Sequence, residues 1–291
     1  MSAKPTPGAR SHAIYARLGV GAPFDPDHRL VTSPFFSPLV LAAVRLGLGF
    51  YALFVLLFHL IWDAVKTNDA DSFFSYFTHL SYTGLVAYYF AAGVQTLCYV
   101  LNRGKRYPLQ RWPRPLQFLH VLLHSTITTY PFVVTVIFWA LLSGPTTFDT
   151  TFDSWINISQ HAMNSLYALV EILLTNVGPS PWWHLPLCII MLACYLGVAY
   201  ITHATQGFYT YSFLDPHKEH AKLAGYIVAV GVAEVLAFLL ARGLTLARTR
   251  LVQLRRASLE RLPDSMDDKP EEAIDEWEEV QRPGTPTGRA V

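Results

Sequence analysis

The sequence predicts an all-α polytopic membrane protein, a bundle of six transmembrane helices with cytoplasmic N- and C-termini. Of its 291 residues, 52% are hydrophobic and only 15% are charged, an apolar balance beyond that of ordinary soluble domains. Six apolar stretches approach or exceed the length of about 20 residues that a helix needs to cross hydrocarbon. The segments between them contain the prolines, glycines and charges that end helices.

The predicted spans follow one another with short connections. They cover residues 39–62, 73–100, 117–142, 156–176, 185–206 and 222–244. The breaking segments are 102–115, 143–154, 178–184 and 213–220. The first 37 residues contain several prolines and no apolar run, so no secretory signal peptide is expected.

Lysine and arginine in the connections predict the orientation, because basic loops are retained in the cytoplasm. Loop 102–115 carries five basic residues, and Arg248, Arg250, Arg255 and Arg256 follow the sixth span. The first, third and fifth connections hold few basic residues or none. Both termini are therefore expected in the cytoplasm.

This pattern divides the chain into four parts. Residues 1–38 form a cytoplasmic tail, 39–244 the six-helix transmembrane domain and 245–262 a basic helical extension. Residues 263–291 are acidic and then rich in proline and glycine, a composition typical of disorder.

Charge and cysteine placement limit the classes of partner. The net charge is +1 and the basic residues are scattered among loops, so no nucleic acid is expected to bind. No obligate protein partner is inferred, and the membrane itself is the main surrounding. Cys98, Cys188 and Cys194 lie in apolar runs, where we expect packed thiols and no disulfides.

Polar residues converge on the non-cytoplasmic leaflet. Thr78 lies five residues into the second span, a depth of roughly 7 Å, and His161 lies five residues into the fourth. His203 comes near the end of the fifth span, on the same side. His59 and Asp63, at the end of the first span, belong to this layer as well. The spans and their orientation were predicted from apolar runs and basic residues alone. The convergence of these polar residues on one leaflet is therefore an independent observation.

The fourth span has a polar stripe. His161, Asn164, Ala168 and Glu171 are spaced i, i+3, i+7 and i+10, so they share one helix face. Glu171 is expected near the middle of the bilayer, protonated or paired, where it holds helices together. Taken singly, each polar residue also has a structural explanation, because intramembrane histidines bond neighbouring helices and threonines bond their own backbone.

A threonine and a histidine near one leaflet are suited to acyl transfer. The Thr78 hydroxyl would attack an ester carbonyl while the His161 imidazole accepts its proton and later returns it to the leaving alcohol. His203, Asn164, Glu171 and Ser81 are candidates for supporting or pocket residues, and the oxyanion donor is sought among Ser81, Tyr82 and Asn164. This chemistry needs no metal and no organic cofactor. A lipid ester would enter sideways from the bilayer.

The segment SWINISQHAMNSLYALVEIL (154–173) resembles the androgen-induced protein family, six-span membrane hydrolases that cleave fatty acid esters of hydroxy fatty acids. The resemblance extends to YFTHLSYTGL (76–85), TYPFVVTVIFW (129–139) and THATQGFYTYSFLD (202–215), and it covers about residues 39–244. It implies a threonine nucleophile in the second span and a histidine partner in the fourth. These roles fall on Thr78 and His161.

The chain departs from that family at two places. Ile158 stands where family members have a second histidine, and His79 has no counterpart that we can assign. HAMNSLYALVE is also similar to the rolling-stone proteins, multispanning proteins linked to cell fusion and without an established reaction. Substrate identity therefore stays open, as does residence in the endoplasmic reticulum or the plasma membrane.

Two other functional classes compete with the hydrolase. His120 and His124 form an HxxxH pattern on the third span, as in membrane di-iron enzymes, but such sites need many histidines and only His184 accompanies this pair. His120 is therefore expected at the membrane interface. A non-enzymatic scaffold, channel or transporter is the other alternative, and a scaffold would not need Thr78 or His161.

Overall fold

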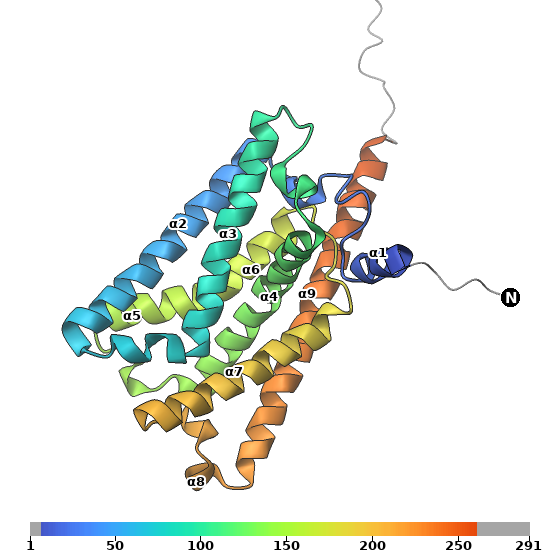
Figure 1. Ribbon diagram of the computed structural model, residues 1–291. Coiled ribbons are helices and arrows are strands. Elements are labelled where there is room, and N and C mark those ends of the chain that lie inside the picture. The colour runs from blue at the N-terminus through green and yellow to red at the C-terminus, as the bar shows by residue number, and fades with distance from the viewer. Residues whose placement is uncertain (1–6, 261–291) are drawn as a thin grey trace, which may run out of the picture. The chain divides into compact units, whose positions relative to one another are not determined.

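Helices make up the regular structure of residues 7–260, the part of the chain that the computed structural model describes, and no strand occurs among them (Figure 1). The prediction of an all-α polytopic membrane protein is confirmed. Residues up to Arg250 form one unit, to which the following description refers, and residues from Leu251 belong to a second. The expected disordered tail, 263–291, lies outside the described residues.

Five helices among the described residues are long and apolar enough to cross a membrane. The first is α2 (Pro38–Trp62), which continues through a π-helical turn to Thr67, and the second is α3 (Phe77–Leu101). The third is α4 (Arg114–Ile137), continued by a π-helical turn to Leu142. The others are α7 (His184–Gln206) and α9 (Lys222–Glu260). They correspond to the first, second, third, fifth and sixth predicted spans.

The fourth predicted span, 156–176, is helical but divided. It consists of α5 (Thr151–Asn157), a π-helical turn (Ile158–Ala162) and α6 (Met163–Leu174). This segment is not one of the five helices above. Six spans and cytoplasmic termini thus remain predictions, although α6 packs along α4 within the bundle.

The second span begins later than its apolar pattern predicts. Residues Ala70–Ser75 form a 3₁₀ helix, Tyr76 is extended, and α3 starts at Phe77. Phe73, only 1% exposed, stacks on His79 with ring centroids 3.8 Å apart. Thr78 is therefore the second residue of its helix, one residue after the helix start and not five. Hydropathy extended the span to Phe73 because this aromatic side chain is buried outside the helix.

Short elements connect the long helices. They are α1 (Pro7–Arg17), α8 (Pro216–Glu219) and 3₁₀ turns at Arg29–Val31, Pro108–Arg111, Pro145–Phe148 and Ser212–Leu214. Helix α9 continues without interruption through the basic stretch that follows the sixth predicted span.

A buried ion pair ties α2 to α6. Arg45 donates from Nε and Nη2 to the two carboxylate oxygens of Glu171, at 2.8 and 2.7 Å, and both side chains are fully buried. Arg45 Nη1 donates to Thr96 Oγ1 at 2.7 Å, and the Tyr88 hydroxyl donates to Glu171 at 3.0 Å. Glu171 is thus paired, one of the two states expected for it.

Helices α2 and α3 lie side by side, and glycine allows the contact (Figure 1). A Cβ at Gly93 would lie 2.7 Å from Leu46 Cδ2 and 2.8 Å from its Cγ. We expect Gly93→Ala to lower the free energy of unfolding by about 1–3 kcal/mol through overpacking. Gly47→Ala is the matched control, because no atom lies within 4 Å of its Cβ position. Denaturant unfolding in detergent compares them, and equal midpoints would contradict the close contact.

The predicted orientation is testable with reporters in two connections. An inserted glycosylation reporter at Asp149 is expected to be modified in the lumen, whereas one at Pro108 is expected to stay unmodified. The physical reason is the basic excess of loop 102–115, which opposes translocation. The same two sites with a cytosolic reporter give the complementary control. Modification of the reporter at Pro108 would show that the orientation is the reverse of the predicted one.

Candidate active site

A polar cavity of about 450 Å³ brings Thr78 and His161 together. Two further histidines, His59 and His79, line it with Gln160. The rings of His59 and His79 are 5.0 Å apart in an edge-to-face arrangement. The cavity thus combines a hydroxyl group with several imidazoles, the groups that proton transfer during acyl transfer requires.

Three π-helical turns contribute to the wall of this cavity. The turn after α2 supplies Asp63 and Thr67, the turn after α4 supplies Phe138 and Leu142, and the turn between α5 and α6 supplies Gln160 and His161. A π-helical turn widens the helix by one residue, and such turns occur frequently at functional sites. Sequence reasoning missed all three, because apolar periodicity does not distinguish one inserted residue.

Packing and hydrogen bonding hold His161 in place. Its ring stacks on Phe138 with centroids 3.6 Å apart and planes 6° apart. The Thr135 hydroxyl donates to the His161 backbone carbonyl at 2.5 Å. The side chain is 8% exposed, and its Nδ1 is buried without a hydrogen-bond partner among the described residues. Within the described structure, no hydrogen bond at Nδ1 therefore fixes the tautomer of this ring.

Thr78 occupies the first turn of α3. The N-cap residue, Tyr76, makes no side-chain capping hydrogen bond, so the first backbone N–H groups of the helix lack that partner. Thr83 and Thr96 on the same helix donate to carbonyls four residues back. Thr78 has no such bond in the described structure, since the residue four before it precedes the helix. Its hydroxyl is thereby not tied to a carbonyl of its own helix.

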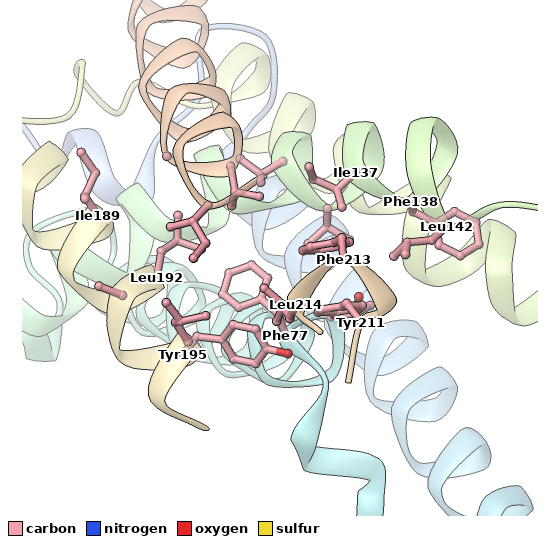
Figure 2. Close-up of a pocket in the computed structure, with 18 residues that line it drawn as sticks. Phe77, Ile137, Phe138, Leu142, Ile189, Leu192, Tyr195, Tyr211, Phe213 and Leu214 are labelled. Carbon is pink, nitrogen blue, oxygen red and sulfur yellow. The ribbon is translucent and has the colours of Figure 1, made fainter. Parts of the chain in front are cut away.

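An apolar cavity of about 190 Å³ adjoins the polar one. Figure 2 shows side chains from α4, α7 and α9 around it, with Phe77 from α3 and Tyr211 and Phe213 from the segment after α7. Thr78 lines this cavity too, and the two cavities share Phe138, Leu142 and Tyr211. Thr78 therefore lies where a polar and an apolar compartment meet.

Tyr211 is a site residue that sequence reasoning did not select. Desolvation raises the pKa of its hydroxyl and the neighbouring Tyr195 raises it further, whereas hydrogen bonding to Thr78 lowers it. Its phenol is thus protonated at neutral pH and lies against Thr78. Its one signal in the sequence was its place in THATQGFYTYSFLD, a segment that carries the family resemblance.

The four residues selected as supporting or pocket residues, Ser81, Asn164, His203 and Glu171, do not line either cavity. Ser81 donates to the Thr78 carbonyl at 3.1 Å, and Asn164 is 1% exposed with its Oδ1 unpartnered in the described structure. His203 stacks on Tyr209 with centroids 3.8 Å apart, and Glu171 is held by Arg45. His161, in the π-helical turn before α6, lines the polar cavity, and Glu171, ten residues later on α6, forms the ion pair.

His120 and His124 have a different environment from the one expected. Both are buried, at 8% and 5% exposure, and their rings lie 5.5 and 5.7 Å from that of Tyr88. His120 is therefore not an interfacial residue, because the α3 tyrosine covers it. Within residues 7–260, no group of three or more His, Cys, Asp or Glu side chains is arranged to hold a metal ion.

Fold and site together define an all-α multispanning membrane protein with a threonine and histidine cavity. The family model described as FAR-17a/AIG1-like protein matches residues 43–245, more than half of the chain. The protein belongs to this family, as the sequence resemblance predicted, and the weaker similarity to rolling-stone proteins stays a prediction. No curated protein and no solved structure matches the chain.

Proposed function

We propose that the protein is a membrane-embedded hydrolase of lipid esters, with Thr78 as nucleophile and His161 as general base and acid. The observation that carries this proposal is the position of Thr78, which lines both cavities while His161 lines the polar one. An ester with a hydrocarbon arm matches such a junction. Membership of the FAR-17a/AIG1-like family is consistent with a membrane hydrolase.

The reaction has two halves. The Thr78 hydroxyl attacks the ester carbonyl carbon, and its proton passes to His161. The bond to the alcohol oxygen breaks, His161 returns the proton to that oxygen, and an acyl-threonine ester remains. Water then attacks the acyl group, gives a proton to His161 and releases the acid as that proton returns to Thr78. One ester and one water become one acid and one alcohol.

Two groups are suited to stabilise the negative charge of the tetrahedral intermediates. The Tyr211 hydroxyl lies against Thr78, and the start of α3 is directly beside it, where the Phe77 and Thr78 backbone groups contact the Tyr195 and Tyr211 hydroxyls. Donors held in place before the reaction are worth most where water is excluded, and the positive end of the helix dipole adds to them. Ser81 is less suited, because its hydroxyl already donates to the Thr78 carbonyl.

The substrate class that we favour is the fatty acid esters of hydroxy fatty acids. Such an ester has two hydrocarbon arms on either side of the scissile bond, and the apolar cavity offers space for one of them beside Thr78. The bilayer would deliver it, since the lining comes from three helices that are apolar enough to span a membrane. The family resemblance supports the same class.

The test compares membranes from cells expressing the full chain with membranes from cells carrying an empty vector. We expect faster release of free fatty acid from a fatty acid ester of a hydroxy fatty acid, measured by mass spectrometry. A phospholipid and a triacylglycerol serve as comparison esters. Equal release from both membranes for every ester would reject the hydrolase and favour a non-enzymatic scaffold.

A further inference from the structure

Glu234 is a buried carboxyl group that the proposed mechanism does not use. It lies on α9, is 0% exposed, and both of its carboxyl oxygens lack a hydrogen-bond partner in the described structure. The surrounding helix is one of the five that are apolar enough to span a membrane. Ionisable groups in such helices are costly to keep, and they commonly mark ligand or ion pathways.

The neighbours of Glu234 leave its oxygens without a free hydroxyl donor. Thr129 of α4 and Cys188 of α7 lie next to the carboxyl group. The Thr129 hydroxyl donates to the Ser125 carbonyl at 3.0 Å, and the Tyr130 hydroxyl donates to the Cys188 carbonyl at 2.8 Å. The weak thiol donor of Cys188 remains, and the Thr129 oxygen can only accept a hydrogen bond. An unsatisfied buried carboxyl costs free energy, so a ligand that supplied a partner would be favoured.

This cluster lies directly beyond the apolar cavity. Val230 and Gly231 of α9 line the cavity, and Glu234 is one helical turn further on the same face. The same relation holds on the other two helices. Cys188 of α7 is one turn before the lining residue Leu192, and Thr129 of α4 is one turn before Val133. The polar cluster, to which three helices contribute, therefore lies next to one end of the apolar cavity. Thr78 lies at the opposite end.

We propose that Glu234 forms a recognition site for an uncharged O–H group on the hydrocarbon arm that occupies the apolar cavity. The inference rests on the proposed function, since that arm belongs to the ester bound at Thr78. Either a hydroxyl group or an undissociated carboxyl group could donate a hydrogen bond to the Glu234 side chain and accept one from it. Glu234 is then a specificity residue that selects oxygenated chains over plain ones.

The helix rise sets the position of that group on the chain. Tyr195 contacts the start of α3, its hydroxyl donating to the Ser75 carbonyl at 3.0 Å, and Cys188 precedes it by roughly 10 Å of helix. Phe138 stacks on His161, and Thr129 precedes it by roughly 13 Å of helix. An extended chain advances about 1.2 Å per bond, so the O–H group would be about ten bonds from the ester carbonyl.

The experiment measures chain binding without turnover. The full chain in membranes, carrying Thr78→Ala, is labelled by a photoreactive, clickable fatty acid methyl ester. Methyl decanoate and methyl 10-hydroxydecanoate, which places its hydroxyl about ten bonds from the ester carbonyl, compete with the label. Glu234→Leu removes the polar group, Glu234→Gln keeps a donor and an acceptor, and Val228→Leu changes a lipid-exposed residue of the same helix. For each variant, the measured quantity is the ratio of the concentrations at which the two competitors halve the labelling. The two esters partition differently into the bilayer, but this difference is the same for every variant and cancels when the ratios are compared.

We expect Glu234→Leu to shift that ratio about tenfold towards the plain ester, the effect of losing one or two buried hydrogen bonds. Glu234→Gln and Val228→Leu should keep the original ratio. An unchanged ratio in Glu234→Leu would overturn the site, as would absence of label from α4, α7 and α9. Loss of hydrolysis alone would not, because a protein that binds oxygenated chains but cleaves no ester would reject only the proposed reaction.

Discussion

Thr78→Ala is expected to lower ester hydrolysis by at least about 10²-fold, because the variant loses the proposed nucleophile and with it the acyl-enzyme route. His161→Ala is expected to lower it by a similar factor, since the hydroxyl then loses the base that we propose for it. The measurement is the initial rate of fatty acid release by membranes that contain equal amounts of each variant.

The pair is expected to act as a unit. The double variant should be little slower than either single variant, because removal of one partner already stops the shared step. Thr78→Ser keeps a hydroxyl at the junction of the two cavities and should retain measurable activity. Thr83→Val, five residues further on α3, removes a hydroxyl that only bonds the His79 carbonyl and should leave the rate unchanged. A Thr78→Ala variant as active as the Thr83→Val control would remove Thr78 from the reaction.

Hydropathy accounted well for the long helices and poorly for their ends. Five of the predicted spans correspond to helices that are apolar and long enough to cross a membrane, because about 20 apolar residues in a row have few other stable environments. The start of α3 was misplaced since Phe73 is apolar and buried in either conformation. This error changed the predicted position of Thr78 along its helix. It did not change the prediction that Thr78 lies near His161.

The shared cavity of Thr78 and His161 was predictable from topology, because alternating spans bring their ends to the same leaflet. The contribution of Tyr211 was not, since the segment after α7 has no periodicity that fixes where a side chain points. Glu234 lies in the sixth predicted span, yet nothing in the sequence connects it to Thr129 or Cys188. Such contacts depend on how helices pack, which no single helix encodes.

Glu171 illustrates the same limit, since its polar stripe indicated a partner without identifying one. Arg45 is that partner, and Glu171→Ala is expected to lower the free energy of unfolding by about 3–5 kcal/mol because it leaves a buried guanidinium unpaired. Arg45→Met/Glu171→Leu should be more stable than Glu171→Ala, since neither charge then remains. Denaturant unfolding of the purified protein in detergent measures each value.

Arg29→Met is the control for removing an arginine from an ion pair. Arg29 and Asp27 form an exposed pair at 3.2 Å, so the loss should be below about 1 kcal/mol. If Glu171→Ala were no more destabilising than this control, the ion pair would add nothing to the bundle. Suppose instead that Glu171→Ala has a low free energy of unfolding and that the double variant regains most of the loss. The destabilisation of Glu171→Ala then comes from the unpaired, desolvated guanidinium of Arg45. Helices α2 and α6 would then need only side chains of matching size and polarity at these two positions.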